Sequence, residues 1–428
     1  MSGLKVGASK VDITPPIGIP MGGYAARPDV AKGIHDRLHA RSVVIEGEEI
    51  VSIVSLELLH IKESVANEAK KLIRKELGIP KDNILIAAIH THSGPSPAEH
   101  YGMAREYYEL LPYYIFTAVK NAYENMQNAR IGYGKGELNG WTVNRRKPMK
   151  GSLDNEVIVV RMEDLKENLI TAIVNFTCHA VVLGHNNLLI SADYPGFTSS
   201  AIEAIENGVA LFLNGACGDI NPLTPRTDLS RVYDRSVGTF EEARKMGYAL
   251  AGEAIKVLNS IRTMDDIPIK VLVKEVSVKR VELPEVSDEE IAELERKYEE
   301  LTKCGKVKEA SKVRIDLVLK KWLKGLRERF PSDYVTIKVQ GIRLGDLVII
   351  AFPGEVLVDI GLKIKKSSKA KLTMIVGYAN GYIGYIPTKE AIKEGGYEAR
   401  PPATVLTEDA EDKLVNTAIE IIDNLVST

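Results

Sequence analysis

An apolar run at residues 84–89 constrains this chain more than any other segment, because it stops abruptly at two histidines and a Gly-Pro turn. A short apolar run bounded by turn signals is typical of a strand buried on both faces, as in the sheets of α/β proteins. Successive strand side chains point to opposite faces, so His90 and His92 project from the same face. Ligands in open α/β sheets bind at the carboxyl ends of strands. The pair therefore predicts a metal centre, whereas a single histidine there would indicate only a satisfied polar group.

Strand and helix patterns alternate along much of the chain. Apolar runs predict strands at 51–56, 84–89, 155–161, 170–176, 209–213, 335–344 and 347–352. Helical patterns cover 62–77, a helix pair over 105–128 interrupted at Pro112, a segment after Gly196, a segment starting near Val356, and 408–425. We predict an α/β protein in which residues 1–428 form one large domain of mixed β-sheets flanked by helices. Several strands end in loops rich in Gly or polar residues, which favours a site at the sheet edge.

Residues 284–332 differ from the rest and predict a helical hairpin inserted into the main fold. Ser287 and Glu290 form the sequence signature of a capping box before a helical pattern, and a second helical pattern follows Gly305. The many Lys and Glu residues are most simply a solvated face. The alternative is that the hairpin covers an active site or joins copies of the chain in a homo-oligomer.

Composition limits the partners and the location. The net charge of −2 gives no electrostatic reason to expect nucleic acid or anionic membranes as partners. No apolar leader begins the chain and no stretch reaches the length of a membrane span, so we expect no stable membrane insertion. Three cysteines, an odd number, suit reduced thiols in the cytoplasm. Abundant Lys, Glu and Ile with little Gln favour a thermophilic source.

Histidines are confined to the first half of the chain: there are 8, and the last is His185. A four-coordinate metal centre must therefore reuse them or recruit Asp, Glu or Tyr from the second half. His179 follows a second apolar strand, Glu355 follows a Pro-Gly turn, and several tyrosines lie between Tyr378 and Tyr397. Alone, each of these indicates packing or helix-end electrostatics. Two His and a Glu, with a Tyr as a further candidate, together predict a zinc shell with an open position.

Short motifs occur in a fixed order over nearly the whole chain. They are Val6-Gly7-Ala8 to Asp12-Ile13-Thr14-Pro15, Gly33-Ile34-His35-Asp36-Arg37-Leu38-His39-Ala40-Arg41, His90-Thr91-His92-Ser93-Gly94-Pro95, Val143-Asn144-Arg145, His179 with Ile190-Ser191-Ala192-Asp193, Gly218-Asp219-Ile220-Asn221-Pro222, Pro353-Gly354-Glu355, and Ala379-Asn380-Gly381-Tyr382 through Tyr385 to Tyr397-Glu398-Ala399. Each is weak alone, but the ordered set is specific. It resembles the catalytic domain of the neutral/alkaline ceramidases, zinc amidases that cleave the N-acyl bond of ceramide.

The resemblance implies a zinc shell and a set of catalytic groups. The implied zinc ligands are His90, His179, Glu355 and Tyr385, with Tyr382 as the alternative tyrosine in the same short motif. His92 would lie beside the metal and hydrogen-bond the oxyanion or the attacking water. Arg145 and Tyr397 match family positions that contact the substrate near the scissile amide.

Two departures from the family pattern change what the resemblance implies. Asn221 stands where the family's Gly-Asp-Val-Ser-Pro motif has a serine, and an amide cannot form an acyl-enzyme. Cys217 could be suggested as a substitute nucleophile, but no base neighbours it in the sequence, so we expect attack by metal-activated water. The sequence also ends soon after the Tyr397 motif, without the family's immunoglobulin-like domain. We therefore expect a substrate other than ceramide.

We predict a zinc-dependent hydrolase that cleaves an amide bond, N-acyl or N-acetyl, in a small or amphiphilic molecule. Asn221, His92, Arg145 and Tyr397 are the expected catalytic residues. The alternatives are a lipid amidase (a true ceramidase), a zinc esterase or lactonase, and a non-catalytic metal-binding relative. A TIM-barrel amidohydrolase also uses a His-x-His strand, but it expects further histidines on later strands, and none follows His185.

Overall fold

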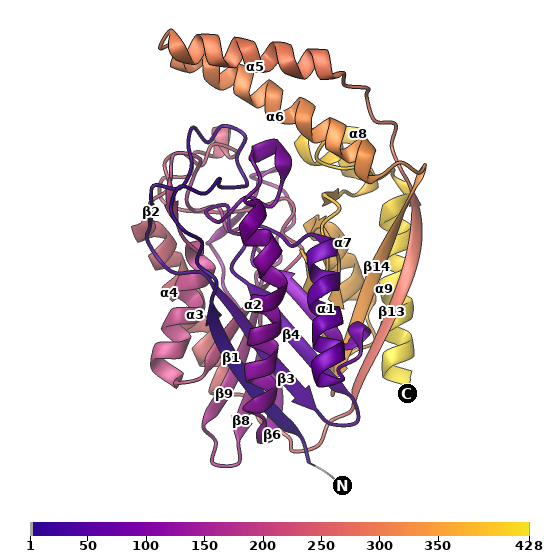
Figure 1. Ribbon diagram of the computed structural model, residues 1–428. Coiled ribbons are helices and arrows are strands. Elements are labelled where there is room, and N and C mark those ends of the chain that lie inside the picture. The colour runs from indigo at the N-terminus through magenta and orange to yellow at the C-terminus, as the bar shows by residue number, and fades with distance from the viewer. Residues whose placement is uncertain (1–2, 428) are drawn as a thin grey trace.

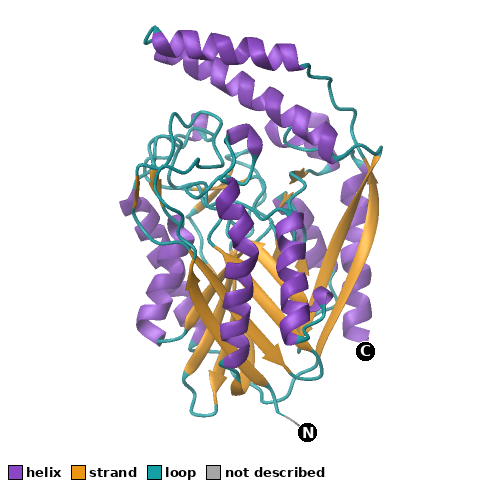
Figure 2. Cartoon of the chain, in the orientation of Figure 1, coloured by secondary structure: helices purple, strands orange, loops and turns teal. Residues whose placement is uncertain are grey.

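The computed structural model describes residues 3–427 and is built around an eight-stranded mixed sheet (Figures 1 and 2). The strand order is β11-β9-β8-β6-β1-β3-β4-β5. Neighbours β4 and β5, and β9 and β11, pair in parallel, whereas the other neighbours are antiparallel. The bounds are β1 Lys5–Asp12, β3 His39–Glu46, β4 Ile50–Leu56, β5 Ile84–Ala88, β6 Gln127–Glu137, β8 Glu156–Asp164, β9 Leu169–Phe176 and β11 Val209–Asn214.

A second sheet of four strands packs on the back of the first. Its order is β13-β14-β15-β17, with bounds β13 Ile269–Lys279, β14 Tyr334–Leu344, β15 Leu347–Ala351 and β17 Leu372–Val376. Alternation along the strands fixes this arrangement, because side chains of both sheets, such as Ile53 and Ile349, share one apolar core. The next residues in sequence, Val54 and Ile350, point the opposite way. Each packs in the apolar core between its own sheet and the helices outside it.

Helices cover both outer faces and complete four layers (Figure 1). The eight-stranded sheet is covered by α1 Glu63–Leu77, α2 Arg105–Glu124, α3 Asp193–Glu206 and α4 Phe240–Leu258. The four-stranded sheet is covered by α7 Val358–Ser367 and α9 Asp409–Ser427. The predicted α/β fold of mixed sheets flanked by helices is confirmed.

The predicted helical hairpin is present as α5 Asp288–Lys303 and α6 Val307–Arg329. It is inserted between β13 and β14, which pair directly from Ile269↔Leu344 to Lys279↔Tyr334. The expected capping box of Ser287 and Glu290 begins α5. In Figure 1 the hairpin lies across the loops at the top of the sheets. Several α6 residues are buried, whereas α5 has none, so α6 is the helix that faces the body.

The prediction of a helix pair broken at Pro112 is wrong. A single helix, α2, continues through Pro112 and ends at Glu124, and residue 128 already belongs to β6. Proline removes one backbone donor, but Leu111 and Ile115 on either side of it are fully buried. This burial keeps the helix continuous. The sequence patterns also did not identify β1, β3, α4, β6 or β13.

Short strand pairs and turns bring the loops together at the top of the sheets. The remaining elements are β2 Gly33–Ile34 with β10 Leu189–Ile190, β7 Thr142–Asn144 with β12 Ile220–Pro222, β16 Glu355–Val356 with β18 Tyr385–Ile386, α8 Lys389–Glu394, and 3-10 turns at Lys81–Asn83, Glu99–Tyr101, Leu229–Arg231 and Tyr397–Ala399.

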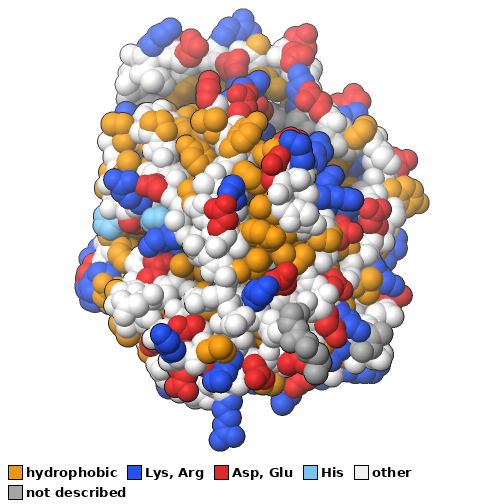
Figure 3. Space-filling model, turned by 60° about the horizontal axis from the view of Figure 1, so that its bottom comes forward, with side chains coloured by type: hydrophobic (Ala, Val, Ile, Leu, Met, Phe, Trp, Pro, Cys, Tyr) orange, Lys and Arg blue, Asp and Glu red, His pale blue; other side chains and the backbone are white. Residues whose placement is uncertain are grey.

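The surface and the cysteines agree with the composition. On the face shown in Figure 3, acidic and basic side chains are interspersed, with hydrophobic groups between them. Across residues 3–427, each helix falls short of the length or apolar character needed to cross a membrane. Cys178, Cys217 and Cys304 are all free thiols. The cytoplasmic location and the thermophilic source stay predictions.

Candidate metal centre and its cavity

The predicted site residues converge from the ends of separate strands. His90 follows β5 and His179 follows β9. Glu355 lies directly opposite Tyr385 in the parallel β16–β18 pair. Asn221 lies in β12, which pairs with β7 immediately before Arg145. The short strand pairs therefore hold residues from distant parts of the sequence in one place.

The two buried histidines His90 and His179 are held so that the same ring nitrogen of each points inward. Nδ1 of His90 donates to the carbonyl oxygen of Leu59 at 2.7 Å, and Nδ1 of His179 donates to that of Cys217 at 2.5 Å. Because a carbonyl can only accept, these bonds place the proton on Nδ1. Nε2 of each ring is then a lone-pair acceptor available to a metal.

Three acceptor atoms face one another at the centre. The Glu355 Oε2 atom lies 3.1 Å from Nε2 of His179 and 3.4 Å from Nε2 of His90. Acceptors do not bond directly to each other, so a shared cation would satisfy all three. Tetrahedral zinc with ligand bonds of about 2.0–2.1 Å would hold its ligand atoms roughly 3.3 Å apart. Ligand atoms of His90, His92 and His179 lie within 4.8 Å of one another, so this group could hold a metal ion.

Electrostatics favour the metal-binding protonation states. Burial alone would raise the pKa of the Glu355 carboxyl, but His90 and His179 hold this pKa well below its usual range. Burial and Arg145 lower the pKa of His179 to about 4, against the opposing effect of Glu355. The centre therefore presents a carboxylate and a neutral His179 imidazole at neutral pH.

His92 lies within the same cluster but is held differently. Its Nε2 is 3.1 Å from Nε2 of His90, and its buried Nδ1 has no hydrogen-bond partner within residues 3–427. Burial, reinforced by the other two histidines, lowers the pKa of His92 well below its usual value. Gly23 packs against the ring so closely that a Cβ there would lie 2.5 Å from Nδ1. Arg27 donates to the His92 carbonyl oxygen at 2.7 Å, which fixes the backbone of this residue.

The two candidate tyrosine ligands occupy different positions. Tyr382 donates to Oε1 of Glu355, the oxygen that does not face the histidines. The hydroxyl of Tyr385 accepts from Nη2 of Arg145 at 2.8 Å. A third tyrosine, Tyr378, lies 3.4 Å from Oε2 of Glu355 through its hydroxyl, and sequence reasoning did not single it out.

Arg145 is the hub of a buried network beside the centre. Its Nε donates to Glu398 at 2.7 Å, its Nη1 donates to Oδ1 of Asn221 at 3.3 Å, and Tyr233 donates to Glu398 at 2.9 Å. Glu398 is fully buried, so it fixes the guanidinium and neutralises its charge. Sequence reasoning missed Glu398, although it directly follows Tyr397 in a motif that was noted. Tyr233 lay in no motif.

A cavity of about 390 Å³ opens onto this network. Its inner wall includes the predicted ligand Tyr385 and the four predicted catalytic side chains, namely His92, Arg145, Asn221 and Tyr397. Its roof is formed by α6 through Ile315, Val318, Leu319 and Trp322. The inserted hairpin therefore covers the site, and its apolar face contributes directly to the cavity. Cys217 is buried outside the lining, and burial raises the pKa of its thiol, so it is poorly suited as a nucleophile.

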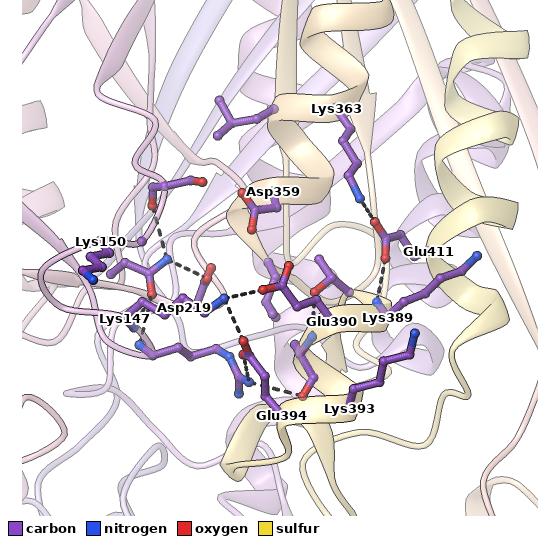
Figure 4. A pocket seen from close by; sticks show the side chains of 18 of the residues that line it. Lys147, Lys150, Asp219, Asp359, Lys363, Lys389, Glu390, Lys393, Glu394 and Glu411 are labelled. Carbon is purple, nitrogen blue, oxygen red and sulfur yellow. Dashed lines mark hydrogen bonds and ion pairs between the residues drawn. The ribbon is translucent and has the colours of Figure 1, made fainter.

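A larger groove of about 810 Å³ lies nearby but has a different character (Figure 4). Its charged side chains largely neutralise each other: Lys147 pairs with Glu390 at 2.6 Å and with Glu394 at 2.8 Å, and Lys363 pairs with Glu411. It contains no histidine among its lining residues. The groove adjoins the site through Arg146, which pairs with Glu398 at 3.0 Å, and through the pair of Asn144 and Asp219. The predicted catalytic side chains line the smaller cavity instead, so that cavity is the better candidate.

A family model described as neutral/alkaline non-lysosomal ceramidase, N-terminal, matches residues 4–230, which is more than half of the chain. The chain belongs to this family. The resemblance predicted from the ordered motifs is thereby confirmed.

Individual ceramidases extend the match. The neutral ceramidase of Pseudomonas aeruginosa is 25% identical over 472 residues, covering 92% of this chain and 68% of that protein. The neutral ceramidase of Drosophila melanogaster is 26% identical over 53% of this chain, which spans only 37% of that relative. The crystal structure of the Pseudomonas aeruginosa neutral ceramidase superposes with a TM-score of 0.79 at 21% identity, covering 99% of this chain and 75% of that one. The shared architecture extends over nearly the whole chain.

Proposed function

We propose that the chain is a zinc-dependent hydrolase that cleaves the amide bond of an N-acyl compound. Membership of the ceramidase family supports hydrolysis of an amide. The observation that carries the zinc assignment is the convergence of three acceptor atoms that one cation would bridge: Nε2 of His90, Nε2 of His179 and Oε2 of Glu355.

Four residues are proposed as zinc ligands: His90, His179, Glu355 and Tyr385. Tyr385 is favoured over Tyr382 because it lies opposite Glu355 in the β16–β18 pair, whereas Tyr382 already donates to the outer oxygen of Glu355. The chemistry that bound zinc supplies is polarisation of the amide carbonyl and activation of water at neutral pH.

His92 is proposed to carry the proton. Its ring lines the cavity, burial keeps it neutral at pH 7, and its Nε2 atom faces the centre, 3.1 Å from Nε2 of His90. A neutral imidazole can take a proton from the attacking water and deliver it to the leaving nitrogen. Gly23 and Arg27 hold the ring in place for this transfer.

Arg145 is proposed to orient the substrate and to stabilise developing negative charge on the carbonyl oxygen. Glu398 and Asn221 hold its guanidinium on two sides. Asn221 also donates to the Val232 carbonyl oxygen at 3.1 Å, so both ends of its amide are engaged and it acts by positioning Arg145. Tyr397, whose ring lies edge-on to Tyr385 at 5.6 Å, is proposed to contact the amide from the cavity side.

An acyl chain is the natural occupant of the apolar roof. Ile315, Val318 and Leu319 on α6 turn apolar side chains toward the polar inner wall, as a substrate with one apolar arm requires. This roof also favours lipid amidase activity as the second candidate, in agreement with the names of the relatives.

The test is turnover of N-acyl amides from acetyl to dodecanoyl by the zinc-loaded protein, with metal content measured in parallel. We expect activity that rises with chain length and is lost, together with zinc, in His90→Ala and Glu355→Ala. Full zinc occupancy in both variants would contradict the ligand set. A zinc-loaded protein that hydrolyses no member of the series would contradict the amidase.

A further inference from the structure

A second cavity of about 430 Å³ lies on the other side of Trp322, which lines both cavities. We call it the α1 cavity, because the first residues of α1 form one wall, and residues 97–100 and the end of α6 form the others. Its floor is the ring of Tyr382, whose hydroxyl donates to Glu355. The side chain of Tyr382 would therefore separate a group bound here from Glu355 in the metal centre.

The N-terminus of α1 has an unfavourable N-cap residue. Lys62 is the N-cap residue and provides no side-chain cap, although Ser, Thr, Asp and Asn are the residues preferred there. A lysine also adds positive charge at the end of a helix that is already partly positive. Within residues 3–427, the hydrogen-bond partner of the Lys62 Nζ atom is the thioether sulfur of Met103, at 3.1 Å, and burial lowers the pKa of Lys62. Such a local conflict is expected where a site is built for a ligand.

The other charges around the α1 cavity leave an excess of positive charge. Lys321 pairs with Glu295 at 2.6 Å, and Glu99 pairs with Arg105 at 3.0 Å, so both lining charges are neutralised. Arg329 donates only to the Tyr382 carbonyl oxygen. Among the residues the structure describes, neither Lys62 nor Arg329 has an acidic partner within 4.0 Å.

One carboxylate, Glu63, also reaches the rim of the cavity, where it acts electrostatically on Arg329 from beyond 4.0 Å. Two cations and a helix N-terminus oppose it, so the balance still favours an anion.

His60 supplies an independent sign of a missing partner. It is 7% exposed, and its buried Nδ1 has no hydrogen-bond partner within the described chain. Its ring lines the α1 cavity and stacks on Tyr382 with centroids 3.9 Å apart and an interplanar angle of 4°. An unpartnered buried polar group costs free energy unless something satisfies it. An anion in this cavity would lie beside the His60 ring, Lys62 and the α1 N-terminus.

We propose that the α1 cavity binds a carboxylate or phosphate group carried on the amine arm of the substrate. The acyl arm would lie under α6, the amide at the metal centre, and the amine arm would pass Trp322 toward Lys62. This placement rests on the proposed amide hydrolysis, whereas binding of an anion to the cavity does not. The substrate class that follows is an N-acyl amine with an acidic head, such as an N-acyl amino acid.

Anion binding is tested by calorimetric titration of the full chain with inorganic phosphate. We expect saturable binding that weakens at least tenfold in Lys62→Met and in Arg329→Gln. Lys321→Met is the matched control, because this lysine lines the same cavity but is paired with Glu295, and it should bind phosphate like the wild type. Equal binding in all four proteins, or no binding in any, would overturn the site.

The source of the anion is tested with two substrates that share an acyl chain, N-decanoylglycine and the uncharged N-decanoylethanolamine. We expect the zinc-loaded wild type to prefer the acid at least tenfold in kcat/KM, and Lys62→Met to lose this preference. Equal efficiency on both substrates, with phosphate binding that depends on Lys62, would overturn the substrate placement and leave a site for free anions. No turnover of either substrate would count against the amidase itself, while the phosphate titration would still decide the site.

Discussion

The ring of Tyr378 stacks on the ring of His90, with centroids 4.0 Å apart and an interplanar angle of 19°. The Tyr378 hydroxyl lies 3.1 Å from the Cys217 thiol and 3.4 Å from Glu355. Tyr378 is buried and adopts a left-handed backbone conformation with φ of 55°, which is uncommon for a residue with a side chain. The side chain of Tyr378 thus contacts two proposed ligands: its ring packs on His90 and its hydroxyl lies beside Glu355. We call this contact the bracing role of Tyr378.

Removing the Tyr378 hydroxyl should loosen the metal centre without emptying it. Tyr378→Phe keeps the stack on His90 and removes the contact with Glu355, and groups that orient ligands commonly change metal affinity by roughly 10–100-fold. We expect zinc to be lost to a chelator at a correspondingly lower chelator concentration. Tyr194→Phe is the control, because the Tyr194 hydroxyl is also buried but donates to the Cys178 carbonyl oxygen at 2.7 Å. Equal zinc affinity in Tyr378→Phe and the wild type would refute the bracing role.

Gly23 and Gly18 offer a matched pair for testing His92. Both glycines have positive φ, of 94° and 85°, but a Cβ at Gly23 would lie 2.5 Å from Nδ1 of His92, whereas a Cβ at Gly18 would meet nothing within 4 Å. Ala is strained at both positions by a similar backbone cost. We expect Gly23→Ala to reduce turnover by at least tenfold while zinc content is kept, and Gly18→Ala to retain both. Loss of zinc in Gly23→Ala would instead indicate that His92 is a ligand.

A buried ion pair outside the lining of the cavity should contribute strongly to the stability of the large sheet. Arg41 is buried and bonds to both Glu57 and Glu203. Arg41→Met leaves the buried Glu57 carboxylate without its cation, and breaking such a pair costs about 3–5 kcal/mol. Lys10→Met removes only an exposed partner of Glu203 and should cost about 0–1 kcal/mol. Chemical denaturation of both variants measures this difference, and a similar small effect in each would contradict it.

Asp219 should make stability depend on pH. Burial raises the pKa of its carboxyl to about 6, against the hydrogen bonds from Val358 and Asn144. The folded state therefore binds a proton that the unfolded state releases near pH 4. The stability contributed by this proton is full below about pH 4 and is lost as pH rises through 6, a change of about 3 kcal/mol. Because Asp219→Asn cannot ionise, the variant should gain stability relative to the wild type between pH 4 and 6 in urea unfolding. A difference that stays constant over this range would contradict the raised pKa.

The strands that carry the centre could be predicted because they are apolar runs ending in polar turns. β5, β9 and β11 appear within one residue of their expected bounds, and the two histidines follow β5 and β9 as expected. Patterns failed where a strand is amphipathic or irregular, as in β6 and β13, since only part of each strand is buried. They also failed at Pro112, where tertiary burial outweighed a local breaker.

The positions of the site residues depended on long-range pairing that no local pattern contains. Glu355 and Tyr385 meet through two-residue strands, and Glu398 reaches Arg145 across 253 positions of sequence. The ordered family motifs identified most of these residues because they reflect the assembled site. Tyr378 and His60 lie outside those motifs, and only the folded chain shows what their side chains contact.

The hairpin of α5 and α6 leaves and re-enters the body through two strands that are already hydrogen-bonded neighbours, at Lys279 and Tyr334. The residues proposed for the chemistry lie in the sheets and loops of the main fold. The apolar roof of the cavity, which would contact the substrate, belongs to this inserted hairpin. In the proposed function, the contacts with the acyl arm and the reaction chemistry would thus depend on separate stretches of the sequence. Replacement of the segment between β13 and β14 would therefore be expected to change the roof of the cavity while the residues of the metal centre stay in place.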